Sequence, residues 1–286
     1  MLIMLAFIAS LYSSPFENSP FYTTAVSDMD LRQFSVTEDN SLKIPAFFKE
    51  KKDKFCVSLN KEQLSYYNSL SEQDKKIFLK LASLGLFNDL SGQKSTTGPY
   101  SYIYKKDHAF YVETLTVIPL KYKDALPVMT DFKTYNEWVL RDINIKRDGE
   151  KGKYFVEINS LNYFEKNGKK FFDTRIDMRI GFKGNYKLDL NILDSTDAKP
   201  VPYFTLKMNE PSKLAKNVEG NFRFIILPGS PYYLTYFLGK SELSWALYRF
   251  LPLALVRSQV GERIYTVMEN IQYRAERAKQ KSKAKL

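Results

Sequence analysis

The chain has 286 residues, of which 44% are hydrophobic and 15% aromatic, so it holds ample material for a packed core. This composition excludes a largely disordered protein, which would be poor in aromatic residues. The formal net charge is +11, but five of the positive charges lie in the last ten residues, so the rest of the chain is only mildly basic. No apolar run reaches about 18 residues, which excludes an ordinary transmembrane helix within this sequence.

The first residues are strongly apolar. Residues 1–11 read MLIMLAFIASL, small residues follow, and Pro15 and Pro20 would then end any helix. This pattern predicts that residues 1–20 are a signal peptide and that the protein is exported, to the periplasm of a bacterium. Because no Lys or Arg precedes the apolar run, a second interpretation stays open, in which the stretch packs on a cytoplasmic protein.

Residues 21–106 are predicted to form a helical extension followed by a linker. The apolar spacing within residues 60–87 favours a helix, and Ser71 begins the sequence SEQD, which fits a capping box. Residues 91–99 read SGQKSTTGP, which is typical of a linker. The extension matches no family that we recognise.

From residue 107 the pattern becomes regular. A strand-like segment is followed by a helix predicted for residues 119–139, and then by short segments in which apolar and polar residues alternate. Asn167-Gly168 predicts a tight hairpin, and turns are also predicted at Gly184-Asn185 and Glu219-Gly220. The connections are too short for parallel crossovers, so the strands are predicted to be antiparallel. The predicted strands cover residues 109–118, 154–164, 171–182, 186–193, 203–209, 222–226 and 232–238.

A long helix is predicted at the end of the chain, and Pro252 suits its first turn. Its apolar residues follow helical spacing from Leu253 to Ile271. The apolar face of the sheet must be covered, and this helix is the only predicted element long enough to cover it. The sequence therefore predicts an α+β fold in which a curved antiparallel sheet wraps around the long C-terminal helix, with an N-terminal helical extension.

This order of elements resembles the START and polyketide-cyclase-like superfamily, the helix-grip group. Residues 132–138 read FKTYNEW, and members often carry an aspartate, an aromatic residue and a tryptophan there, as Asp131, Tyr135 and Trp138 stand in this chain. The resemblance covers residues 107–278. It implies a cavity between the sheet and the last helix, which in members of the group holds lipids, sterols, quinones or other apolar molecules.

The predicted site follows from that arrangement. Trp138 is interpreted first as a structural plug at the end of a helix and second as a ligand contact. The aromatic-rich segment 227–255 would lie near the mouth of the cavity, either packed in the core or in contact with a membrane. The residues predicted to contact the ligand are Thr114, Trp138, Ile180, Leu190, Leu206, Phe224, Tyr236, Val260, Ile264 and Val267. Those predicted to contact a membrane are Tyr233, Phe237 and Trp245.

The predicted function is binding or transfer of an apolar ligand by a protein that is not an enzyme. Two alternatives stay open: a cyclase-like enzyme that uses the same cavity, with Glu113 as its acid or base, and an interaction module with a filled core. The single cysteine, Cys56, and the single histidine, His108, exclude metal motifs that need several such ligands, and no cofactor is predicted.

Two binding partners are considered from the charge. The basic tail, residues 279–286, is predicted either to attract anionic lipid or to be a solvated helix end. Nucleic acid is not a predicted partner, because the aromatic residues fall mostly on the core face of the strands and no nucleic-acid-binding motif is present.

Overall fold

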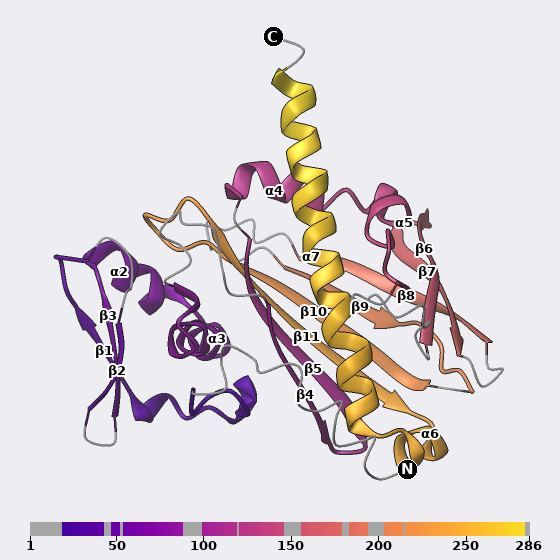
Figure 1. The fold of residues 1–286 in the computed structure, drawn as a ribbon, viewed down its shortest axis with the longest axis horizontal. Coiled ribbons are helices and arrows are strands. Elements are labelled where there is room, and N and C mark those ends of the chain that lie inside the picture. Colours follow the sequence, from indigo (N-terminus) through magenta and orange to yellow (C-terminus); the bar gives the residue numbers. More distant parts are fainter. Residues whose placement is uncertain are drawn as a thin grey trace.

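The structure is a computed structural model that describes residues 19–42, 47–51, 54–87, 99–118, 120–145, 156–178, 183–193, 203–213 and 215–283. A small N-terminal part lies beside a large sheet, and the long C-terminal helix crosses that sheet (Figure 1). Within the described residues, no helix has both the length and the apolar character needed to span a membrane.

The N-terminal part contains helices, as predicted, together with a three-stranded sheet that the sequence analysis did not predict. The helix expected over residues 60–87 is divided in two, because the side chain of Ser71 accepts a hydrogen bond from the backbone N–H of Asp74 and starts a second helix. The elements of the N-terminal part are the 3-10 turns η1 (Val26–Asp28) and η2 (Leu31–Gln33), strands β1 (Phe34–Glu38), β2 (Phe47–Lys51) and β3 (Lys54–Leu59), and helices α2 (Lys61–Ser69) and α3 (Glu72–Ser83).

The large sheet has eight strands in the order β4-β5-β11-β10-β9-β8-β7-β6. Every neighbouring pair is antiparallel, as predicted. β4 lies before residue 107, so the sheet begins earlier in the chain than the predicted domain boundary. The strands are β4 (Tyr100–Lys106), β5 (Ala109–Ile118), β6 (Val156–Lys166), β7 (Lys169–Met178), β8 (Lys183–Leu193), β9 (Tyr203–Met208), β10 (Ala215–Ile225) and β11 (Tyr233–Leu243).

Glycines mark one predicted turn correctly and two wrongly. Asn167 and Gly168 both have positive φ, at 53° and 72°, and form the predicted hairpin between β6 and β7. Gly184 pairs with Ile176 inside β8, and Gly220 lies inside β10. The two predicted turns at these positions are therefore wrong, because a glycine in a strand can also serve close packing.

The helices of the main unit follow the predicted order with more interruptions. The helix expected over residues 119–139 consists of α4 (Tyr122–Met129), the 3-10 turn η4 (Phe132–Thr134) and α5 (Tyr135–Trp138). At the end of the chain, α6 (Trp245–Phe250) precedes α7 (Leu253–Lys283), and Pro252 lies between them. In Figure 1, α7 runs obliquely across one face of the sheet and its C-terminal end reaches beyond the sheet.

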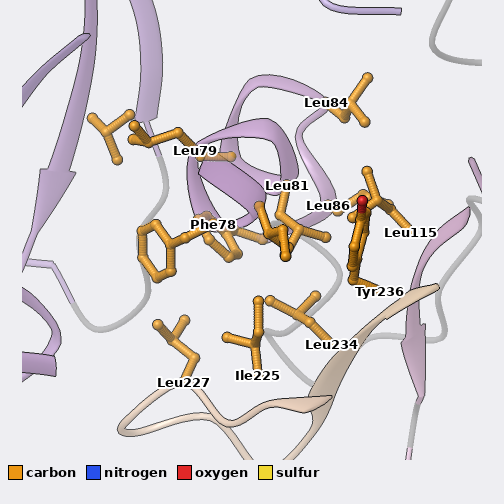
Figure 2. Close-up of a cluster of buried hydrophobic side chains, with 14 of the residues drawn as sticks. Phe78, Leu79, Leu81, Leu84, Leu86, Leu115, Ile225, Leu227, Leu234 and Tyr236 are labelled. Atoms are coloured by element: carbon orange, nitrogen blue, oxygen red, sulfur yellow. The ribbon is translucent and has the colours of Figure 1, made fainter. Parts of the chain in front are cut away.

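The sheet is covered on both faces, which we call the helix side and the extension side. On the helix side, a core of Ile118, Phe204, Phe224 and Tyr233 packs against α4, α5 and the C-terminal half of α7. The extension side packs against α3. Figure 2 shows this second core, in which Phe78 and Leu81 of α3 meet the sheet residues Leu115, Ile225, Leu234 and Tyr236 and the loop residue Leu227.

Candidate ligand-binding site

Strand register assigns each sheet residue to one of the two faces, because paired residues point to the same side. Phe237 pairs with Thr114 on β5 and with Phe222 on β10. Since Phe222 packs against the helix-side core, all three residues lie on the helix side. This face is therefore mostly apolar with a few hydroxyl groups, which is the general composition of sites for apolar ligands.

Burial along α7 falls from its C-terminal half to its N-terminal half. Ile271 and Ala275 are 2% and 3% exposed and belong to the helix-side core. Val256, Val260 and Ile264 follow the same helical face, yet each is only half-buried. None of these three joins a cluster of buried apolar residues in the part of the chain that the structure describes. The apolar side chains of the N-terminal half of α7 are thus less completely covered than those of its C-terminal half, although Arg257 bonds this half to β4 through the carbonyl of Ile103. We call this less covered part of the helix side the loosely packed region.

An aromatic row crosses the helix side of the sheet, from β9 through β10 to β11. The ring centroids of Phe204 and Phe222 are 4.5 Å apart, and those of Phe222 and Phe237 are 4.4 Å apart. Phe204 is buried at one end of the row, whereas Phe222 and Phe237 remain half-buried. The row thus begins in the packed core and ends at side chains that are only half-buried.

Two glycines accommodate the ring of Phe237 on the helix side. A Cβ atom at Gly239 would come within 3.0 Å of this ring, and one at Gly220 within 3.2 Å. A larger residue at either position would therefore force the ring to shift. Sequence reasoning missed this role because it interpreted Gly220 as a turn residue.

Glu113 does not lie in this region. It pairs with Leu238, which packs against the extension-side core, so its carboxylate points away from α7. The carboxylate accepts hydrogen bonds from the backbone N–H of Val26 at 3.0 and 3.1 Å, and from the Lys80 ammonium at 3.1 Å. The hypothesis of a cyclase with Glu113 in the cavity therefore loses its proposed acid or base.

Lys80 and Glu113 form a fully buried ion pair between the N-terminal part and the sheet. Their side chains are 0% and 1% exposed. Lys80 also donates to the carbonyl of Thr24 and lies 4.7 Å from the ring centroid of Tyr100. Burial lowers the pKa of Lys80, and the negative charge of Glu113 opposes that effect. The pair therefore links α3 of the N-terminal part to the extension side of β5.

The predicted ligand contacts mostly fall on the helix side. Thr114 and Phe224 are buried there, and Leu206 pairs with Gly220 and is half-buried. Val267 packs against the same core. Val260 and Ile264 lie on the loosely packed part of α7, and Leu190 pairs with Leu206 in the sheet. Ile180 lies outside the described residues.

Two predicted contacts need correction. Tyr236 lies on the extension side, where it is 1% exposed and packs under α3 (Figure 2), so it does not face the ligand region. Tyr233 is also 1% exposed, inside the helix-side core, so it is not placed to touch a membrane. Phe237 is half-buried beside Phe222 on the helix side, and its predicted membrane contact stays a prediction. The sequence could not separate these aromatic residues, because β11 is buried on both faces.

Trp138 has the position of a structural plug. It is 6% exposed, its Nε1–H donates to the hydroxyl of Thr134 at 3.1 Å, and its ring lies 5.1 Å from that of Tyr135. All its described contacts are with the helix-side core and its own helix. The first of the two interpretations made from the sequence is the one this packing favours.

α6 is an exposed aromatic helix at the N-terminal end of α7. Trp245 and Phe250 are 63% and 73% exposed, and the guanidinium of Arg249 lies 5.2 Å from the centroid of the Trp245 ring. On its other face, the backbone carbonyls of Tyr248 and Leu251 accept hydrogen bonds from the Lys105 ammonium. The helix is therefore tethered to the hairpin of β4 and β5 while its two largest side chains face solvent.

The described residues contain no cluster of three or more His, Cys, Asp or Glu side chains that could bind a metal ion.

In the comparison with known proteins, no protein-family model and no curated protein matches the chain. Three solved structures show what it is similar to.

The first is the di-domain aromatase/cyclase BexL from the BE-7585A biosynthetic pathway, with 12% identity and a TM-score of 0.40, over 71% of this chain and 58% of that chain. The chain thus spans little more than half of BexL. Zhui aromatase/cyclase from Streptomyces sp. R1128 has 12% identity and a TM-score of 0.41, over 59% of this chain and 95% of that chain. The STAR-related lipid transfer protein from Xanthomonas axonopodis has 11% identity and a TM-score of 0.37, over 62% of this chain and 96% of that chain.

The chain has a helix-grip fold. Its strand, helix, antiparallel strands and long C-terminal helix follow one another as the sequence predicted, and α7 lies across the sheet (Figure 1). The helix-grip unit begins at β4, and the N-terminal part packs on the extension side of β4, β5, β10 and β11.

Proposed function

We propose that the protein binds an apolar ligand between the N-terminal half of α7 and the helix side of the sheet, and that it acts as a carrier and not as an enzyme. The observation that supports this is the change in packing along α7. Ile271 is buried in a core, whereas Val260 and Ile264 on the same helical face are half-buried, and so are Phe222 and Phe237 of the aromatic row on the helix side of the sheet.

Such a region favours a ligand for a simple reason. Removing apolar surface from water stabilises a complex by about 25 cal/mol per Å². Phe222, Phe237, Val260 and Ile264 are all half-buried and so keep accessible apolar surface, which an apolar ligand would bury. Carriage is favoured over catalysis, because the helix side of β4, β5, β9, β10 and β11 presents no acidic side chain among the described residues.

The direct test is to identify what the protein carries. We expect native mass spectrometry of protein purified from its own host to show a bound apolar molecule that organic extraction removes. The extracted protein should then take up a fluorescent lipid with a stoichiometry of one. A protein that is free of ligand and takes up no lipid after extraction would contradict the proposal and would favour an interaction module with a filled core.

We propose in addition that α6 contacts a lipid bilayer during loading or release. Tryptophan and phenylalanine suit the bilayer interface, and arginine suits anionic headgroups. Residues 244–261 carry Arg249 and Arg257 and no acidic residue, so the charge of this segment complements an anionic surface. α6 also adjoins the loosely packed half of α7, through which a ligand would pass.

Replacing both Trp245 and Phe250 with alanine should weaken binding to anionic vesicles by about tenfold or more, because it removes the two largest exposed apolar side chains of α6. Co-sedimentation with phosphatidylcholine vesicles, with and without phosphatidylglycerol, measures the effect. The matched control replaces Tyr265 and Tyr273, which are exposed aromatic residues elsewhere on α7. Equal loss in both double variants would refute a specific role of α6.

A further inference from the structure

Two hydroxyl groups face each other on the helix side of β4 and β5. Ser101 and Thr114 are register partners in this antiparallel pair, so their Cβ atoms are about 5 Å apart. Thr114 also pairs with Phe237 of the aromatic row on its other side. The two hydroxyls therefore lie at the border of the loosely packed region.

Neither hydroxyl has a partner in the described structure. The Oγ atom of Ser101 and the Oγ1 atom of Thr114 are shielded from solvent and make no hydrogen bond, and Thr114 is 4% exposed. Buried polar groups are almost always paired, and an unpaired one is unfavourable. A pair of such groups at one place indicates that a further molecule supplies the missing hydrogen bonds.

No acidic side chain of the described β4, β5, β9, β10 and β11 faces these hydroxyls, and the two cations near β4 already donate to backbone carbonyls. On the helix side of β4, β5, β9, β10 and β11, Lys105 alone carries a formal charge among the described residues. It lies at the hairpin end, where its ammonium donates to the carbonyls of Tyr248 and Leu251. Arg257 donates through its Nε–H to the carbonyl of Ile103 and is exposed. A carboxylate or phosphate placed beside Thr114 would have to draw one of these cations away from its carbonyl partners, whereas an uncharged polar group needs no such rearrangement.

We infer that the apolar ligand carries an uncharged hydrogen-bonding group, such as an alcohol, ketone or ester, which pairs with the hydroxyls of Thr114 and Ser101. This inference rests on the proposed function, because it names the chemical class of the ligand for the same site. A ligand carbonyl would accept from both hydroxyls, and a ligand alcohol would donate to one and accept from the other.

The test compares two probes that share a fluorophore and a chain: 12-(9-anthroyloxy)stearate and the corresponding stearyl alcohol. We expect the extracted protein to bind the alcohol about tenfold more tightly than the carboxylate at pH 7. Thr114→Val keeps the shape of the side chain and removes the hydroxyl. It should weaken binding of the alcohol by about fivefold to tenfold, the effect of one lost hydrogen bond.

Stability provides the second readout. Because the Thr114 hydroxyl has no partner in the unliganded protein, Thr114→Val should leave the melting temperature unchanged or raise it. The control is Thr205→Val on the extension side of β9, which should alter neither affinity. Equal binding of both probes, tighter binding of the carboxylate, or a lowered melting temperature in Thr114→Val would overturn the inference while leaving an apolar site intact. Failure of both probes to bind would reject the site itself.

Discussion

Replacing Glu113 with glutamine is expected to destabilise the protein by about 3–5 kcal/mol, because it leaves the Lys80 ammonium buried without its counter-ion. Urea unfolding followed by circular dichroism measures the change in free energy of unfolding. Lys80→Met should have an effect of similar size, since the Glu113 carboxylate would then be the uncompensated charge.

Two further variants separate the charge effect from general disruption. Replacing both residues with apolar ones, Lys80→Met with Glu113→Leu, should recover much of the lost stability, because no isolated charge remains. Lys106→Met breaks the exposed pair with Asp28 and should change stability by less than about 1 kcal/mol. If Glu113→Gln stays within about 1 kcal/mol of the unmodified protein, the buried pair does not hold the two parts together.

Replacing Val260 with tryptophan is expected to abolish lipid uptake and to leave the fold stable. Val260 lies on the half of α7 that packs loosely on the sheet, so the larger side chain would occupy the space proposed for the ligand. Uptake of a fluorescent lipid and the melting temperature are the two measurements. The matched control is Ile271→Trp on the packed half of the same face, where overpacking should destabilise the fold by about 1–3 kcal/mol.

The opposite pattern would end the carrier hypothesis. In a solid core, Val260→Trp would lower stability as Ile271→Trp does, and the unmodified protein would take up no lipid. Retained uptake in a stable Val260→Trp variant would instead place the ligand elsewhere in the molecule.

The sequence predicted the main fold because most strands of the large sheet follow a clear alternation. β5 was predicted with the bounds that the structure shows, and the antiparallel order, the Asn167-Gly168 hairpin and the covering helix were also predicted correctly. β1, β2 and β3 were missed because they are short and show no regular alternation. β4 was missed because the preceding linker composition masked its start.

The candidate site was harder to predict, for a physical reason that β5 illustrates. Alternation identifies one buried face, but this strand is buried on both faces by two different parts of the chain. The direction of Glu113 was therefore ambiguous, and the same difficulty placed Tyr236 on the wrong face. The role of Gly239 could not be predicted from the sequence. It makes room for the ring of Phe237 together with Gly220, and the two glycines become neighbours only through the register between β10 and β11.

The extension-side core has a consequence for folding during synthesis. Phe78 and Leu81 pack with Ile225 and Leu234, and the Gln63 side chain donates to the backbone carbonyl of Pro228. The N-terminal part is thus made first but cannot complete its core until β10 and β11 have left the ribosome. The newly made extension must therefore keep apolar surface exposed while most of the chain is still being translated. Contacts between segments so distant in sequence also form slowly, which prolongs this exposure.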